Sequence, residues 1–410
     1  MSLRERFFEY VKIDTASVEE AGCIPSSEGQ WELAGLLKRQ LEELGAEEVE
    51  LTENCFVFAS LPATKGLERA KTVGLLAHLD TAPDCPGKGV KPVLHPRYDG
   101  GTIVLENGLT IDPRRYPELL RYIGDDIVTS DGTTLLGADD KAGIAIIMET
   151  VSELTTNADR PHGKIRIGFT PDEEVSVGGA SILDVDGFGA DYGITVDGDG
   201  VGELNFETFN GCTVKVEIEG NNIHPAEAKG KMIHACALAM ELDGLLPGDQ
   251  RPQFTEGREG FYHLCEMKGD VETASMEYIL RDFDRAVLQA RIDAVQAAAE
   301  SLNRKYGQDR VKISVFHEYS NPWEILKDRP ALVEGCKEAF SVCGMEPVIT
   351  PIRGGTDGST LSEKGLPCPN LFLGGHNYHS CREYVSVQAM EKSKEVLLKM
   401  IEIFAKDRTE

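Results

Sequence analysis

The sequence contains no long run of uncharged apolar residues. No stretch approaches the roughly 18 such residues that a membrane span requires. The chain begins MSLRERFFEYVKIDT, so Arg4, Glu5 and Arg6 stand where a secretory signal would need an apolar core. We therefore expect no membrane span and no export, which implies a cytoplasmic location.

Paired cysteines are also missing. The ten cysteines are scattered along the chain, and no two of them form a C-x-x-C pair. This pattern is more typical of free thiols in a reducing compartment than of a disulfide framework or a thiolate zinc site. No cysteine has a plausible histidine base beside it in sequence, which weakly disfavours cysteine catalysis, although such partners can meet in space.

Basic residues are few relative to acidic ones. The 410 residues include 42 lysines and arginines against 69 aspartates and glutamates, a net charge of −27. Because so acidic a surface repels phosphate groups, we expect neither nucleic acid nor an anionic membrane as a partner. Most of these acids can simply keep the protein soluble, while a few can neutralise bound metal ions.

The chain is long enough for two domains. Before about residue 208, apolar strand-like runs alternate with helical patterns, which is typical of an α/β sheet covered by helices. The elements expected there are strands at 57–61, 73–77, 165–170 and 193–196 and helices at 31–44 and 141–154, the first preceded by Ser27 and Gln30 at capping-box spacing.

From about residue 210 the pattern changes to half-exposed antiparallel strands. The elements expected after that point are strands at 214–218, 277–283 and 311–316 and helices at 231–245, 284–303 and 387–404. We predict an α/β catalytic domain with a mixed sheet flanked by helices, formed by residues 1–208 and 320–410. An inserted α+β sandwich domain, residues 209–319, interrupts it.

Five separate segments place metal-binding side chains directly after an apolar strand or a turn. In VGLLAHLDTAPD, His78 and Asp80 are two residues apart, so they project to the same face of an extended chain. Asp80 can then accept the second ring N–H of His78 and strengthen it as a ligand. A purely structural histidine–aspartate pair explains this segment equally well.

The next two segments carry adjacent acids. In TSDGTTLLGADDKAG, Asp139 can present both oxygens to a pair of ions, whereas Asp140 better suits a helix N-terminus. In FTPDEEV, Glu173 and Glu174 repel one another away from water unless cations are present. One glutamate can bind metal while the other accepts a proton, although solvated loop acids are the simpler interpretation of this segment alone.

The last two segments complete a possible ligand set. Asp197 follows the predicted strand at 193–196, and the run from Asp197 fails as a calcium loop because Thr208 stands where such a loop needs glutamate. In LFLGGHNYHSCREYVSV, His376 and His379 offer nitrogen ligands, which zinc accepts together with carboxylates. Five such segments, each at the end of a predicted element, favour a metal site over coincidence.

These segments also carry a family resemblance that runs nearly end to end. The resemblance is carried by PSSEGQW, GADDKAGIA, FTPDEEV, TVDGDGVGELNFE, GNNIHPAEAKG, RDFDR, PIRGGTDG and GGHNYH. In that order and spacing, they resemble the co-catalytic zinc exopeptidases related to aminoacylases and glutamate carboxypeptidases, and within them the tripeptide aminopeptidases. The resemblance implies a hydrolase that releases the N-terminal residue from short peptides, tripeptides in particular. It also implies two zinc ions per subunit, with cobalt or manganese as alternatives, and a homodimer formed through the inserted domain.

The resemblance further implies roles for single residues. His78, Asp139 and Asp197 would surround one zinc ion, and Asp139, Glu174 and His379 the other, so that Asp139 bridges the pair.

The same resemblance implies the catalytic and substrate-binding residues. Asp80 would orient the first histidine ligand, and Glu173 would be the general base for attack by a metal-bridging hydroxide. His224 would approach the substrate carbonyl, and Arg281 and Arg353 would hold the peptide carboxylate.

Other interpretations remain open. A dipeptidase or an N-acyl-amino-acid deacylase would share the same metal core, and cleavage of a free-amine tripeptide compared with its N-acetylated form would distinguish them. A non-catalytic metal-binding protein is a different class, but such a site has no need of Glu173. A purely structural dimerisation module would leave the five segments without a role.

Overall fold

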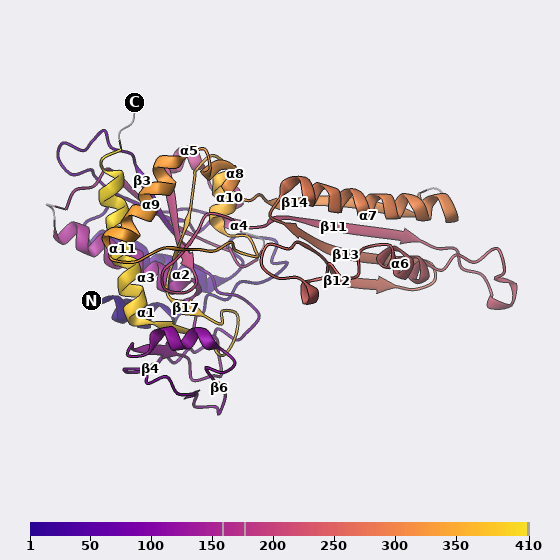
Figure 1. Ribbon diagram of the computed structural model, residues 1–410, viewed down its shortest axis with the longest axis horizontal. Helices are drawn as coiled ribbons and strands as arrows, with labels where there is room; N and C mark the ends of the chain where they lie inside the picture. Colours follow the sequence, from indigo (N-terminus) through magenta and orange to yellow (C-terminus); the bar gives the residue numbers. More distant parts are fainter. Residues whose placement is uncertain (158–159, 176–177, 308, 408–410) are drawn as a thin grey trace. The chain divides into compact units, whose positions relative to one another are not determined.

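The computed structural model describes residues 1–157, 160–175, 178–307 and 309–407. Its contacts divide the chain into two compact units (Figure 1). The first unit comprises Met1–Phe206, Pro322–Thr350 and Thr356–Glu410, and the second comprises Glu207–Asn321 and Pro351–Gly355. Among the helices in the described ranges, none is both long enough and apolar enough to cross a lipid bilayer.

A mixed eight-stranded sheet forms the centre of the first unit, as the alternating pattern predicts. The strand order is β1-β2-β8-β3-β9-β16-β10-β15. These strands are β1 (Glu47–Leu51), β2 (Val57–Leu61), β3 (Val73–His78), β8 (Ile165–Thr170), β9 (Tyr192–Gly198), β10 (Glu203–Asn205), β15 (Val348–Ile349) and β16 (Asn370–Phe372). The central strands β8, β3, β9 and β16 run parallel, whereas β1 with β2, β2 with β8 and β10 with β16 are antiparallel.

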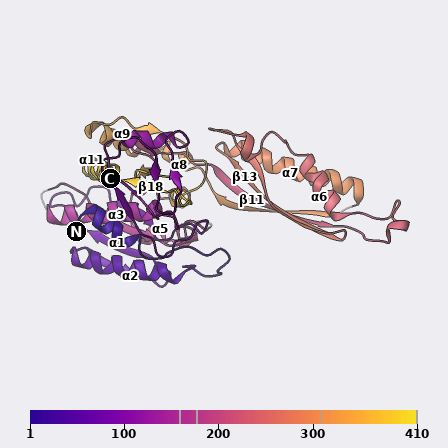
Figure 2. The same ribbon diagram turned by 90° about the horizontal axis from the view of Figure 1, so that it is seen from below.

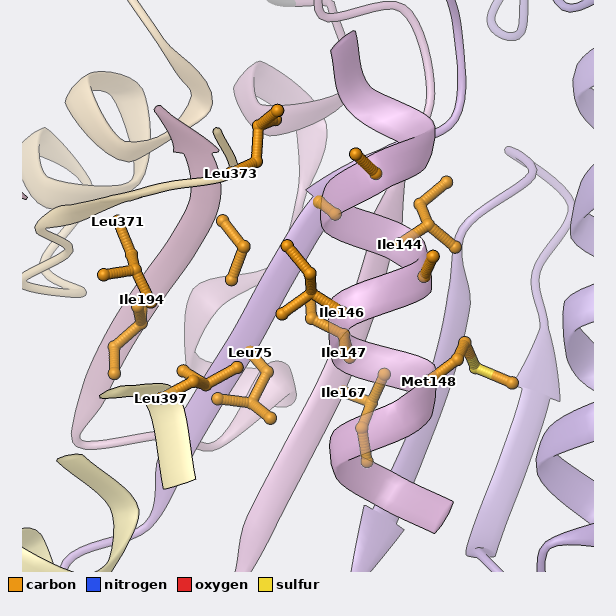
Figure 3. Close-up of a cluster of buried hydrophobic side chains, with 14 of the residues drawn as sticks. Leu75, Ile144, Ile146, Ile147, Met148, Ile167, Ile194, Leu371, Leu373 and Leu397 are labelled. Carbon is orange, nitrogen blue, oxygen red and sulfur yellow. The ribbon is translucent and has the colours of Figure 1, made fainter. Parts of the chain in front are cut away.

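Helices cover both faces of this sheet. One face packs against α1 (Leu3–Tyr10), α2 (Glu28–Glu43), α3 (Ala138–Thr156), α9 (Pro330–Val342) and α11 (Val387–Phe404). The opposite face packs against α4 (Gly178–Ile182), α5 (Val185–Phe188) and α10 (Asp357–Glu363). In β3, Leu75 joins the first core and Leu76 the second, so the strand is apolar throughout because both of its faces are covered. Figure 3 shows α3 directing Ile146 and Ile147 toward the strand side chains, Leu75 and Ile167 among them.

Most of the expected elements are present, but one expected cap is wrong. The helix at 387–404 coincides with α11, and the helix expected at 31–44 is α2. Ser27 is the N-cap residue of α2, yet its side chain makes no capping bond. Gln30 instead donates to Ser27 Oγ at 3.2 Å and to Asp172 Oδ1 at 2.7 Å, because the buried Asp172 competes for its amide.

The second unit is a four-stranded antiparallel sheet with two helices on one face (Figure 2). Its strands and helices are β11 (Asn210–Glu219), β12 (Phe261–Gly269), β13 (Thr273–Asp282), β14 (Val311–Tyr319), α6 (Ala235–Gly244) and α7 (Arg285–Tyr306). As expected, Asp284 caps α7 by accepting the N–H groups of Ala286 and Val287. Strand β12 was not predicted, because it is an edge strand whose side chains are mostly exposed and it therefore lacks a strong apolar pattern.

Candidate metal centre

Three neighbouring strands of the first unit deliver polar side chains to one edge of the sheet. His78 is the last residue of β3, Glu173 and Glu174 follow the end of β8, and Asp197 lies near the end of β9. These strands are parallel and adjacent, so their carboxyl ends meet at the same edge. A fourth ligand candidate, Asp139, comes from the start of α3.

The imidazole of His78 is at the centre of this group and is almost fully buried. Its Nε2 lies 2.8 Å from Asp139 Oδ1 and 3.7 Å from Asp197 Oδ1. Its Nδ1 lies 3.3 Å from Asp80 Oδ1 and 3.1 Å from the Asp80 carbonyl oxygen. One ring nitrogen therefore faces two possible ligands, while the other faces the residue expected to orient the ring.

Asp80 contacts the two glutamates as well as His78, and the contact with the glutamates was not predicted. Its side chain is 0% exposed, and its Oδ1 and Oδ2 accept the backbone N–H groups of Glu173 at 3.0 Å and Glu174 at 3.1 Å. A single buried carboxylate therefore holds both a histidine on β3 and the two glutamates after β8.

His379 approaches the group from the C-terminal part of the chain. Its Nε2 lies 3.0 Å from Glu174 Oε2 and 3.5 Å from Asp139 Oδ2, and its Nδ1 lies 3.4 Å from Asp84 Oδ2. His78 faces the other oxygen of the same Asp139 carboxylate. The five residues expected to bind metal, His78, Asp139, Glu174, Asp197 and His379, are thus brought into one network of close contacts.

Two sets of three side chains have the spacing of a metal site, and both contain His78. One adds Asp139 and Glu174, and the other adds Asp140 and Asp197, with the ligand atoms of each set within 4.8 Å of one another. Asp140, however, accepts the N–H groups of His78 and Gly143 at 3.1 Å each. Its Oδ1 therefore holds the backbone near the start of the regular part of α3, as expected for an acid at a helix N-terminus, while its Oδ2 holds the end of β3.

The residues present fit divalent cations. Glu174 Oε1 is buried and has no hydrogen-bond partner among the described residues, although Oε2 of the same carboxylate contacts His379. A buried unpaired carboxylate oxygen is costly unless a cation or water occupies the space beside it. Imidazole and carboxylate groups are both ligands that zinc and other divalent metals accept.

The pKa values of the buried carboxyl groups show how unfavourable it is to hold several negative charges close together at this site. Burial, and then the charge of Asp139, raise the pKa of Glu174 to about 7 and that of Asp197 to about 6. The pKa of Glu173 is raised well above its usual range, mainly by burial and by its acidic neighbours. Hydrogen bonds with Asp139 and Glu174 raise the pKa of His379 to about 11. Positive charge among these carboxylates would relieve their mutual repulsion.

His376 lies outside this network, although the sequence analysis considered it as a nitrogen ligand. Its Nε2 lies 2.8 Å from the hydroxyl of Tyr122, and burial lowers its pKa to about 4. It belongs to neither of the two sets of metal-spaced side chains found among the described residues.

Two buried acids beside the site were missed by the sequence analysis. Glu383 is 2% exposed and accepts several backbone N–H groups in the segment that ends at Asp139. Asp357 is 3% exposed and accepts the hydroxyl proton of Thr170 at 2.5 Å, and burial raises its pKa to about 7. The one signal for Glu383 is an acid directly before the apolar residues of β18 (Tyr384–Ser386).

The cysteines also depart from expectation. Cys85 and Cys381 form a disulfide with their Cα atoms 6.5 Å apart, although free thiols were expected throughout. The two cysteines are 296 residues apart, and no spacing pattern links them. Cys85 follows Asp84 and Cys381 follows His379 by two residues, so the bond joins the two segments that meet at the Asp84–His379 contact.

The expected substrate-binding residues all belong to the second unit. His224 is exposed and accepts the N–H of Ala226 through Nδ1. Arg281 is 9% exposed and pairs with Glu318 at 2.5 Å. Arg353 donates to the carbonyl oxygens of Gly257 and Glu259, at 2.8 Å each, and to Thr255 Oγ1 at 3.1 Å.

Known proteins resemble this chain in sequence and in fold. Residues 132–403 match the family described as peptidase family M20/M25/M40. Peptidase T of Clostridium perfringens is 46% identical over 403 residues, which cover 98% of this chain and 99% of the relative. The crystal structure of the aminopeptidase PepT from Bacillus cereus has a TM-score of 0.77 and 25% identity, covering 98% of both chains. A tripeptidase from Staphylococcus aureus has a TM-score of 0.78 and 22% identity, covering 99% of this chain and 98% of its own. These matches span the segments that carry the sequence resemblance and confirm it: the chain belongs to the peptidase family M20/M25/M40.

Proposed function

We propose that this protein is a metal-dependent aminopeptidase that releases the N-terminal residue from short peptides, with tripeptides as its main substrates. Membership of a peptidase family and 46% identity to peptidase T of Clostridium perfringens support the reaction. The observation that carries the proposal is the convergence of His78, Asp139, Glu174 and His379 at one edge of the sheet, with Glu173 beside them.

We assign the site to a pair of divalent ions, with zinc as the preferred metal. His78, Asp139 and Asp197 would hold one ion, and Asp139, Glu174 and His379 the other. The support is that His78 Nε2 faces Asp139 Oδ1 at 2.8 Å while His379 Nε2 faces Asp139 Oδ2 at 3.5 Å, so each oxygen serves a different histidine. Bound ions would polarise the scissile carbonyl and lower the pKa of a water molecule beside it.

Residues beside the metal ions would then transfer protons and hold the ligands in position. The carboxylate of Glu173 accepts the proton of the attacking water and later passes one to the departing amine. Asp80 keeps that glutamate in place through the Glu173 N–H at 3.0 Å and orients His78 through Nδ1. Glu173 and Glu174 thus have separate tasks, because Glu174 faces His379 at 3.0 Å.

The second unit would recognise the peptide. Arg353 is the stronger candidate for the peptide carboxylate, because within the described part of the chain its guanidinium donates to uncharged carbonyl and hydroxyl oxygens. The charge of Arg281 is already balanced by Glu318. The exposed ring of His224 is the candidate for contact with the substrate carbonyl.

We further propose a cytoplasmic homodimer that forms through the second unit. Its edge strand β14 exposes Val315 (39%) and Phe316 (51%), and exposed edge strands are prone to pair with another chain. Light scattering coupled to size exclusion would test this, and a purely monomeric protein at micromolar concentration would contradict it.

The function can be tested with a peptide panel. Purified protein should cleave a free-amine tripeptide faster than matched di- and tetrapeptides, leave the N-acetylated tripeptide intact, and lose activity with a chelator. Zinc-loaded protein that is inert on the whole panel would contradict the proposal. Faster cleavage of the N-acetylated peptide would indicate a deacylase instead.

A further inference from the structure

The carboxylate of Glu383 accepts four consecutive backbone N–H groups. Its Oε2 accepts from Leu136 at 2.7 Å and Gly137 at 2.8 Å, and its Oε1 accepts from Ala138 at 2.7 Å and Asp139 at 3.2 Å. The side chain is 2% exposed, so water cannot readily replace these bonds.

Two of these four N–H groups directly precede α3, and the other two belong to its first two residues. The first N–H groups of a helix have no partner within it, and consecutive amides that point to one spot form a favourable position for an anion. Asp139 itself is not helical, with φ −81° and ψ 103°. Its orientation therefore does not follow from the helix and must come from other contacts.

Glu383 supplies such a contact at Asp139 itself. Its bond to the Asp139 N–H constrains the peptide plane directly before the Asp139 Cα, and hence the direction in which that side chain leaves the backbone. Glu383 also follows His379 by four residues, so the same short segment carries a histidine that faces Asp139. The carboxylate thus links the backbones of two candidate metal ligands.

We propose that Glu383 is a positioning residue that sets the orientation of Asp139 toward both metal positions and holds it in register with the His379 segment. The proposal rests on the proposed metal site. A residue that only supports the fold would affect stability alone, whereas this role requires Glu383 to control the affinity for metal.

The test is a zinc titration of metal-free protein by competition with a chromophoric chelator. In Glu383→Gln, an amide NH₂ must face two of the four N–H donors, so their bonds are lost with little change in volume. Residues that hold metal ligands commonly change metal affinity by about 10–100-fold, and we expect a loss in that range for both zinc ions, because Asp139 serves both.

Asp191→Asn is the matched control. Asp191 accepts the Thr72 N–H at 2.8 Å and pairs with Lys71 at 3.1 Å, and it directly precedes β9, at the strand end opposite Asp197. This variant removes the same charge and weakens a backbone hydrogen bond, so it should lower the unfolding midpoint and leave zinc affinity unchanged.

The outcomes separate this inference from the proposed function. If the wild-type protein binds no zinc, the proposed function fails. If the wild type binds zinc and Glu383→Gln binds it within twofold of wild type, or Asp191→Asn loses as much affinity, the positioning role is overturned. If the glutamine variant does not fold, Glu383→Asp replaces it, since it keeps the charge but withdraws the carboxylate by one carbon. Wild-type zinc affinity in that variant would equally overturn the role.

Discussion

Replacement of Asp80 by asparagine offers a sharp test of how the candidate metal centre is held together. Asp80 Oδ1 faces both His78 Nδ1 at 3.3 Å and the Glu173 N–H at 3.0 Å, whereas Oδ2 faces only the Glu174 N–H at 3.1 Å. The asparagine oxygen should therefore take the place of Oδ1, because an oxygen in that position can accept hydrogen bonds from two donors. The asparagine NH₂ then faces the Glu174 N–H, and because both groups are donors no hydrogen bond can form between them.

The magnitude follows from that geometry. One hydrogen bond to a buried carboxylate is lost and a buried N–H is left unpaired, which costs about 1.5–3 kcal/mol. The substitution should displace Glu174, whose Oε2 faces His379. The loss of metal affinity should therefore be confined to the metal position that Glu174 and His379 share. A weakening of metal affinity of about 10–100-fold is typical of changes to groups that hold metal ligands.

Three measurements check this prediction. Urea unfolding of metal-free protein should show the loss of stability, and zinc titration should show one weakened ion while the other stays near wild type. Turnover of a tripeptide at saturating zinc should recover in large part, because the ligands themselves remain. Wild-type zinc affinity in Asp80→Asn would refute the reasoning, since it would mean that the two glutamates do not depend on Asp80.

Further predictions concern single side chains. Glu173→Ala should keep its zinc, measured by elemental analysis, while turnover falls by about 10²–10⁴-fold, and near-wild-type activity would show that the base is misassigned. His379→Ala should instead lose metal. The pKa of His376 is lowered to about 4, so the unfolded chain binds a proton below its ordinary value of 6.5 while the native chain does not. The protonation of His376 in the unfolded chain should therefore lower the free energy of unfolding by roughly 2 kcal/mol between pH 7 and pH 5, and urea unfolding of metal-free His376→Gln should lack this contribution. Thiol titration in denaturant should count eight free cysteines before reduction and ten after it, because of the Cys85–Cys381 bond, and ten before reduction would contradict it.

Local pattern was enough to predict most of the catalytic scaffold. Strand β3 is buried along its whole length, and β8 is buried at every residue except the half-buried Arg166. Strands covered on both faces are rich in apolar residues and can be recognised without knowledge of their neighbours. Their ends could also be located, because His78 ends the apolar run of β3, and Thr170 and Pro171 end that of β8 shortly before Glu173. The parallel order of strands then makes their meeting at one edge a general expectation of α/β sheets.

The contacts that hold the site together could not be predicted in this way. Gln30 has the spacing of a capping residue, yet it bonds to Asp172, which is 142 residues away. Cys85 and Cys381 lack any motif, and the edge strand β12 lacks an apolar face. In each case the outcome depends on which distant group competes for a side chain, and local spacing contains no information about that competition.

The sequence by itself determined which chemical groups stand at the ends of which strands, since burial on two faces imposes a periodicity that short segments display. Only the tertiary structure decided how those groups are held: Asp80 reaches glutamates 93 and 94 residues away, and Glu383 reaches backbone donors 244 to 247 residues away. The physical reason is that a buried carboxylate needs hydrogen-bond donors, and the folded chain decides which donors lie beside it. Every residue except proline carries a backbone N–H group, so the sequence does not show which of these groups will be the partners.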